Sequence, residues 1–109
     1  LIRLTDETDP LRDNLLFAEA KLETEEDIRI QKLGEIHKQY KNTDGGMQAF
    51  YELAFMDFTK WRQQDNSNAE LKLKYKEEAR TALSNFISMY PESFYIEQTK
   101  KYLDEIQAN

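Results

Sequence analysis

Residues 45–62 read GGMQAFYELAFMDFTKWR. The apolar residues in this stretch are Met47, Ala49, Phe50, Tyr51, Leu53, Ala54, Phe55, Met56, Phe58 and Trp61. On an α-helix with 3.6 residues per turn, these positions cover most of the circumference. A helix that is apolar nearly all round has to be enclosed by other elements. The sequence therefore predicts a helix at about 45–62 that is central to its domain.

Periodic apolar residues predict four further helices. They fall at about 10–22, about 24–41, about 69–90 and about 93–107. Residues 1–9 lack helical periodicity, so we expect a lead-in segment there, followed by a single helical domain at 10–109. No stretch has the pattern of a strand. Five helices joined by short polar breaks predict an all-α fold.

Start and stop signals place the helix ends. Asp9-Pro10 is typical of a helix start, with Asp as N-cap and Pro at the first helical position. Thr24 is predicted to cap the second helix, because three acidic residues follow it and favour the helix dipole. Pro91 ends the fourth helix, and Ser93 is predicted to cap the fifth. The predicted apolar faces are Leu11, Leu15, Ala18 and Leu22 in the first helix, and Phe94, Ile96, Tyr102, Leu103 and Ile106 in the fifth.

The composition excludes several kinds of chemistry. The 109 residues have a net charge of −6, no Cys and one His. An acidic balance disfavours nucleic acid as a partner, and the lack of Cys removes disulfides, thiolate nucleophiles and Cys-based zinc sites. No apolar run is long enough to span a bilayer, so we expect no direct membrane insertion by this segment. We also expect no catalytic residue, no cofactor and no metal.

Three local features have simpler explanations than a functional site. His37 has no assignable nucleophile or carboxylate partner and is expected to lie on a helix face. The acidic residues at 23–27 are explained by stabilisation of a helix start, since they lack the pattern of a calcium loop. Gly45-Gly46 precedes a helix without the Lys-Ser/Thr of a phosphate loop, so we interpret it as a flexible turn.

The chain contains an internal repeat at an offset of 50 residues. The matching pairs are Leu33 with Leu83, Ile36 with Phe86, Tyr40 with Tyr90, Thr43 with Ser93 and Leu53 with Leu103. Gly34 pairs with Ser84, so both copies are small at that position. Because a Gly inside a helix costs about 1 kcal/mol relative to Ala, Gly34 predicts the close approach of another helix.

These motifs resemble the tetratricopeptide repeat family. AFYELA at residues 49–54 is similar to its first-helix motif, and Ala79, Leu83, Phe86 and Pro91 are similar to its second-helix motif. The junction YPESFY at 90–95 resembles that of bacterial envelope members of the family, of the outer-membrane assembly lipoprotein and Tol–Pal accessory protein type.

The resemblance implies an α-α superhelix. It would consist of two degenerate helical hairpins, at about 11–41 and 45–91, and a capping helix at about 94–107. The family period is about 34 residues, and the excess in this chain falls in the polar loop at 63–68 and the charged start of the fourth helix. The segment at 63–76 is therefore a candidate surface for a specific partner. Asp57 also departs from the family, which usually has an aromatic residue there.

The resemblance further implies a peptide-binding groove on the inner face of the superhelix. The groove residues would be Arg12, Leu15, Glu19, Gln48, Tyr51 and Phe55. They lack the Lys and Asn of the carboxylate-clamp subtype, and Tyr51 and Phe55 favour apolar or aromatic anchors. We therefore expect a non-catalytic scaffold that binds another protein or peptide. The resemblance also implies the bacterial periplasm or envelope, with a membrane anchor upstream.

Two other functions stay open. The chain could be a stacking segment of a longer helical solenoid or of an oligomer formed by self-association, because at least about three repeats are usually needed for stability. It could also be a helical-bundle ligand-binding domain or an enzyme, which predicts a deep pocket holding carboxylates with shifted pKa values. The sequence supports that last alternative only through its many Asp and Glu residues.

Overall fold

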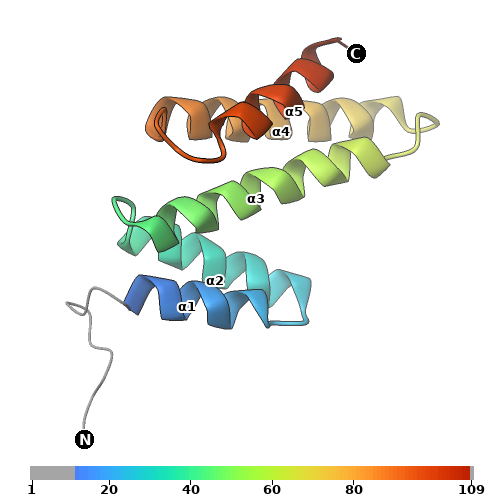
Figure 1. The fold of residues 1–109 in the computed structure, drawn as a ribbon. Helices are drawn as coiled ribbons and strands as arrows, with labels where there is room; N and C mark the ends of the chain where they lie inside the picture. The colour runs from blue at the N-terminus through green and yellow to red at the C-terminus, as the bar shows by residue number, and fades with distance from the viewer. Residues whose placement is uncertain (1–11, 109) are drawn as a thin grey trace, which may run out of the picture. The chain divides into compact units, whose positions relative to one another are not determined.

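The computed structural model describes residues 12–108, apart from the side chain of Asp13, and these residues form five α-helices and no strand (Figure 1). The helices are α1 (Arg12–Lys21), α2 (Glu26–Gln39), α3 (Asp44–Gln63), α4 (Ala69–Met89) and α5 (Ile96–Ala108). The predicted all-α class is therefore confirmed, with each helix within a few residues of its expected bounds. The lead-in segment at 1–9 and the helix start at Asp9-Pro10 lie outside the described residues.

The chain divides into two compact units, Leu1–Phe50 and Tyr51–Asn109. The first unit holds α1, α2 and the start of α3, and the second holds the rest of α3 with α4 and α5. The boundary falls inside α3, and this helix contributes buried residues to both units, Ala49 to the first and Phe58 to the second. The single domain expected at 10–109 stays a prediction.

The core of the second unit joins three helices. Its buried residues are Ala54, Phe58 and Trp61 from α3, Ala79 and Leu83 from α4, and Ile106 from α5. Ala54 and Ala79 are fully buried, as expected of small residues where two helices pack closely. α4 and α5 lie side by side (Figure 1). The buried Thr99 on α5 is satisfied because its hydroxyl donates to the Tyr95 carbonyl at 2.8 Å.

In the first unit α1 packs against α2, but not through the predicted face. Leu15, Ala18 and Leu22 are exposed, while Ala20 is fully buried. Leu11 lies outside the described residues. The prediction was wrong because α1 carries a second apolar stripe, made of Leu16, Phe17 and Ala20, and the spacing of either stripe suits a helix. Packing against α2 selects the second one.

The internal repeat has a structural counterpart in the two junctions that follow α2 and α4. In each junction the amide of the closing Tyr donates to the carbonyl four residues earlier, and the amide of Thr or Ser donates to the carbonyl of that Tyr. The distances are 2.8 Å for Tyr40 to Ile36 and 2.9 Å for Tyr90 to Phe86, and 3.0 Å for both Thr43 to Tyr40 and Ser93 to Tyr90. The matched side chains Leu33 and Leu83 are both fully buried. The offset of 50 thus relates two turns with the same backbone hydrogen bonds.

The two glycines at 45–46 do not form a flexible turn, as the sequence had suggested. Both are buried inside the first turn of α3, and Thr43 caps that turn by accepting a hydrogen bond from the Gly46 amide at 3.2 Å. A Cβ on Gly46 would lie 1.9 Å from the Tyr40 carbonyl oxygen. Gly46 is therefore required by the close approach of the backbone before and after the turn.

Gly34 has the opposite environment. A Cβ on Gly34 would meet no atom within 4 Å, so the predicted close approach of another helix at this position is wrong. Gly34 lies on a half-exposed part of α2. The small residue at this position of the repeat therefore does not reflect tight packing against another helix.

Two predicted caps are also corrected. Thr24 does not cap α2, since Glu25 occupies the N-cap position without a side-chain cap bond, and the Glu23 carboxylate accepts from the Glu25 amide instead. Ser93 accepts from the Tyr95 amide at 3.0 Å and so holds a turn in front of α5, which begins only at Ile96. Phe94 therefore lies in this turn and is exposed rather than part of the apolar face of α5.

We expect the variants Gly46→Ala and Gly34→Ala to change stability in opposite directions. Gly46→Ala should lower the free energy of unfolding by about 1–3 kcal/mol, because the added methyl group forces the Tyr40 carbonyl to move. Gly34→Ala should raise it by roughly 0.5–1 kcal/mol, because alanine favours the helix and has open space there. Urea denaturation followed by circular dichroism measures both. Equal effects would contradict the two environments described.

Candidate interaction surface

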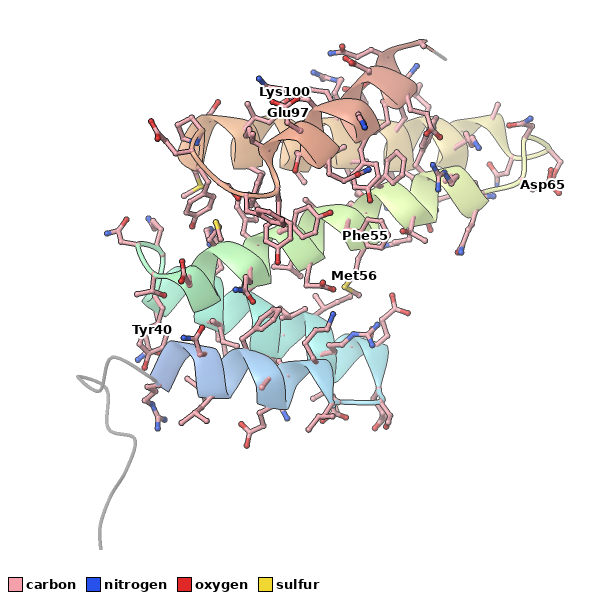
Figure 2. All side chains as sticks on the ribbon, viewed as in Figure 1. Tyr40, Phe55, Met56, Asp65, Glu97 and Lys100 are labelled. Carbon is pink, nitrogen blue, oxygen red and sulfur yellow. The ribbon has the colours of Figure 1, made fainter. Side chains whose placement is uncertain are left out.

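A row of aromatic side chains lies on α3, on α5 and in the turn before α5 in the second unit, and Figure 2 labels Phe55 among them. Tyr51 stacks on Tyr95 with ring centroids 4.2 Å apart, and Phe55 lies 5.4 Å from Tyr102. Tyr51 and Phe55 are themselves 6.5 Å apart along α3. We call these four residues, together with Phe94, the aromatic surface.

The helical spacing of these residues produces the row. Tyr51 and Phe55 are four residues apart on α3, so their side chains lie on the same face. Tyr95 lies in the turn directly before α5 and Tyr102 lies on α5, and they contact Tyr51 and Phe55 of α3 respectively. The Tyr51–Phe55 pair is thus fixed locally by one helix, while the contacts with Tyr95 and Tyr102 come from packing in the second unit.

The aromatic surface is only partly covered. Phe94 is 92% exposed and touches Tyr95 edge-on with ring centroids 5.7 Å apart, and Phe55 is 36% exposed. Tyr51, Tyr95 and Tyr102 are half-buried. Exposed aromatic side chains that border a row of half-buried ones indicate a contact surface, since each exposed ring keeps a large apolar area in contact with water.

The surface also has an electrostatic property. Burial raises the pKa of the Tyr51 phenol far above its usual value, and a hydrogen bond with the Tyr102 side chain raises it further. Tyr51 is therefore a neutral phenol across the physiological pH range. The arrangement can offer apolar ring faces with a neutral hydroxyl, which suits binding better than proton transfer.

The predicted groove residues fall into both units. Arg12, Leu15, Glu19 and Gln48 belong to the first, and Tyr51 and Phe55 to the second. Leu15 is 53% exposed on α1, and Glu19 borders a hollow of about 200 Å³ together with Leu16 and Lys32. The structure brings Tyr51 and Phe55 together as expected of neighbours on one helical face. The groove that would join all six residues stays a prediction.

Sequence reasoning missed three members of the aromatic surface. Phe94 and Tyr102 were assigned to the interior face of the fifth helix, and Tyr95 was noted only as part of a motif. The available signal was the position of Phe94 and Tyr95 directly after Pro91, in a junction where turn residues commonly lie at the surface. An apolar residue in such a turn is a candidate contact residue.

Across residues 12–108 no three His, Cys, Asp or Glu side chains lie close enough to hold a metal ion. His37 stacks on Phe50 with ring centroids 4.3 Å apart, and burial lowers its pKa. Among these residues there is also no helix with the length and apolarity needed to cross a bilayer.

Comparison with known proteins gives no relative for this chain. No model of a protein family, no curated protein and no solved structure matches it. The resemblance to tetratricopeptide repeats therefore stays a prediction from the motifs, and the geometry described above is the basis for proposing a function.

Asp57 on α3 should make the protein less stable at neutral pH than at mildly acidic pH. Burial raises the pKa of this half-buried carboxyl, and the charge of Glu78 raises it further while Lys60 lowers it. A carboxyl whose pKa is higher in the folded than in the unfolded state disfavours folding once both forms are ionised. We expect Asp57→Asn to raise the melting temperature at pH 7, and the gain to shrink as the pH falls towards about 4.

The matched control for this prediction is Asp104→Asn, which changes the net charge equally at an exposed position on α5. Thermal unfolding of both variants at pH 7 and at mildly acidic pH provides the comparison. An Asp57→Asn variant that melts below the wild type at pH 7 would show that the carboxylate is stabilising, contrary to this expectation.

Proposed function

We propose that this chain is a non-catalytic protein–protein interaction scaffold and that the aromatic surface of the second unit is one of its contact regions. The observation that carries the proposal is the exposure of Phe94, at 92%, and of Phe55, at 36%, next to stacked tyrosines. Aromatic residues dominate the energetics of protein interfaces because they bury a large apolar area with few rotatable bonds. A partner with apolar or aromatic anchors suits this surface.

A tetratricopeptide-like arrangement is part of this proposal. It is supported by the two junctions with matching hydrogen bonds at an offset of 50 and by the small residues Ala54 and Ala79 in the core. In such an arrangement Arg12, Leu15, Glu19, Gln48, Tyr51 and Phe55 would line the inner groove. A site of action in the bacterial envelope or periplasm is proposed on the sequence resemblance alone.

A photo-crosslinking experiment tests the contact region directly. A benzophenone amino acid placed at position 94 or position 55 should give a discrete covalent adduct when cells that make the protein are irradiated. The control position is Lys100, because Glu97 and Lys100 project from α5 away from Phe55 (Figure 2). Adducts that are equally strong at all three positions, or absent at both aromatic ones, would contradict the proposed surface.

Single substitutions should separate binding from folding. Phe94→Ala should change the free energy of unfolding by less than about 0.5 kcal/mol, because its ring is mostly in water. It should weaken binding of the cross-linked partner by roughly tenfold or more if Phe94 is an interface anchor. Calorimetric titration measures the affinity, and Phe55→Ala provides a second variant. Tyr51 is less suitable, because it also packs against Phe86 with ring centroids 5.6 Å apart.

A second candidate function is a stacking segment of a longer helical solenoid. The exposed apolar residues of α1 favour it, since Leu15 is 53% exposed, Ala18 is exposed as well, and Leu22 directly after the helix is 80% exposed. A neighbouring repeat would cover such a stripe. Leu15→Asp should then leave the isolated chain as stable as the wild type but weaken its packing when further repeats are present. Unchanged stability in both settings would argue against stacking.

A further inference from the structure

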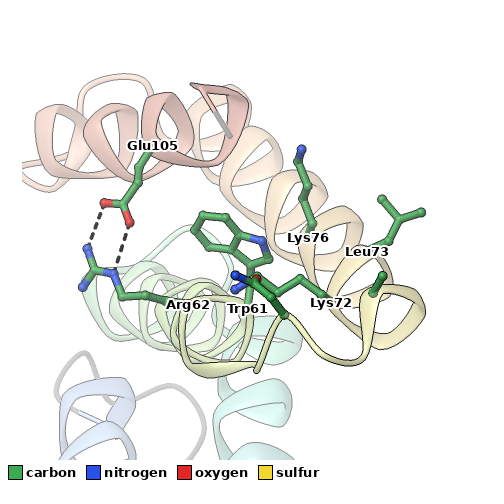
Figure 3. Close-up of a pocket in the computed structure, with 8 residues that line it drawn as sticks. Trp61, Arg62, Lys72, Leu73, Lys76 and Glu105 are labelled. Carbon is green, nitrogen blue, oxygen red and sulfur yellow. Dashed lines mark hydrogen bonds and ion pairs between the residues drawn. The ribbon is translucent and has the colours of Figure 1, made fainter.

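The α3–α4 hairpin of the second unit carries a basic pocket at its end, where residues 64–68 connect the two helices (Figure 3). The pocket encloses about 490 Å³. Its lining includes Trp61, Arg62, Lys72, Leu73, Lys76 and Glu105. None of these residues belongs to the aromatic surface, so the pocket is a separate candidate site.

The pocket exists because this hairpin is long. α3 has 20 residues and α4 has 21, whereas α2 has 14. The extra residues that the sequence placed near 63–76 are therefore helical for the most part. Asn68 fixes the start of α4 by accepting a hydrogen bond from the Leu71 amide at 3.1 Å. Trp61, a buried member of the core of the second unit, and the exposed Leu73 both line the space at this end of the hairpin (Figure 3).

Three charged side chains of the pocket are held in place by contacts. Arg62 and Glu105 form a two-pronged ion pair, with N···O distances of 3.2 and 2.9 Å. The Lys72 ammonium donates to the neutral Gln64 carbonyl at 2.9 Å and lies 5.2 Å from the centroid of the Trp61 ring. Neither contact of Lys72 neutralises its charge. With Lys76 beside it, the pocket is positive in a chain whose net charge is −6.

The pocket also has an apolar part. Leu73 lines the cavity and is 58% exposed, whereas Trp61 is 5% exposed and has the Lys72 ammonium over its ring. An occupant that matches both features has carboxylates for the lysines and an apolar side chain for Leu73. A phosphate or a nucleotide would use the charge but not the apolar part.

We propose that residues 22–27 of a second copy of this chain occupy the pocket. This segment joins α1 to α2 and reads LETEED, with Leu22 80% exposed and with Glu25, Glu26 and Asp27 exposed as well. It offers an exposed leucine directly beside several carboxylates. The charge and the apolar character of the segment are therefore complementary to those of the pocket.

The segment is held in shape before it binds. The Leu22 amide donates to the Glu19 carbonyl at 3.2 Å, and the Glu25 amide donates to the Glu23 carboxylate at 3.3 Å. Glu23 also pairs with Lys32 at 3.2 Å, which ties the segment to α2. A prearranged segment loses less conformational entropy on binding than a flexible one.

The contact joins two different surfaces, so it is heterologous. A pair of bound chains has one free pocket on one chain and one free acidic segment on the other, so the assembly grows head to tail unless the rotation closes a ring. Because the contacts are charged and lie near the surface, the association weakens with added salt. This inference goes beyond the proposed function, since neither contact surface includes the aromatic surface.

Charge reversal tests the proposal by analytical ultracentrifugation of the whole chain. The pocket variant is Lys72→Glu/Lys76→Glu, and the segment variant is Glu25→Lys/Asp27→Lys. The wild type should associate in low salt at concentrations up to about 1 mM, and each variant alone should associate at least about tenfold more weakly because like charges then face each other. An equimolar mixture of the two variants should recover the association, because it contains one native pocket and one native segment.

Two matched controls separate this contact from a general effect of net charge. Lys74→Glu/Lys101→Glu changes the net charge as the pocket variant does, and Glu92→Lys/Asp104→Lys changes it as the segment variant does, all at exposed positions outside the two surfaces. Both should associate like the wild type. Circular dichroism establishes that every variant is folded before it is compared.

Trp61 provides an independent readout, since it is the only Trp in the chain and lines the pocket. Its fluorescence should change with protein concentration in the wild type, and Leu22→Ser, a substitution at an exposed position, should abolish that change. A wild type that stays monomeric up to about 1 mM, or a folded pocket variant that associates as strongly as the wild type, would overturn the proposal.

Discussion

The packing of Phe58 is the interaction on which the second unit depends most. Its fully buried ring stacks on Tyr102 at 4.5 Å and lies 5.8 Å from Trp61, and the Arg62 guanidinium covers it at 4.7 Å. Truncating a buried Phe typically costs about 3–5 kcal/mol, which is a large part of the stability of a small domain. Tyr102 belongs to the aromatic surface, whereas Trp61 and Arg62 line the basic pocket. The Phe58 ring therefore contacts residues of both candidate surfaces from within the core.

The helices themselves could be predicted because their signals are local. The apolar run at 45–62, the Pro at 91 and the polar residues before α4 each act within a few positions of the helix that they define. The apolar face of α1 could not be predicted, since two stripes fit the same period and only contact with α2 decides between them. The surroundings of Gly34 and Gly46 could not be predicted either. The space around a glycine depends on how other parts of the backbone pack, which the neighbouring residues in the sequence do not determine.

The two candidate surfaces were accessible from the sequence to different degrees. Tyr51 and Phe55 are one helical turn apart, so their proximity follows from helix geometry alone. The pocket joins Arg62 to Glu105 across 43 positions, and no pattern in a single sequence links residues that far apart. The charged segment at 63–76 could be singled out as unusual, but its hollow shape arises only when the two long helices are packed together.

The neutral Tyr51 phenol has a thermodynamic consequence for any ligand of the aromatic surface. Because burial keeps its pKa far above physiological pH, complex formation at this residue releases and takes up no proton. Tyr51 therefore adds no buffer ionisation enthalpy to the measured heat of binding. Burial of the surrounding rings would instead be recorded in a negative change of heat capacity. A heat of binding that differs between buffers of different ionisation enthalpy would therefore arise from other titrating groups and not from Tyr51.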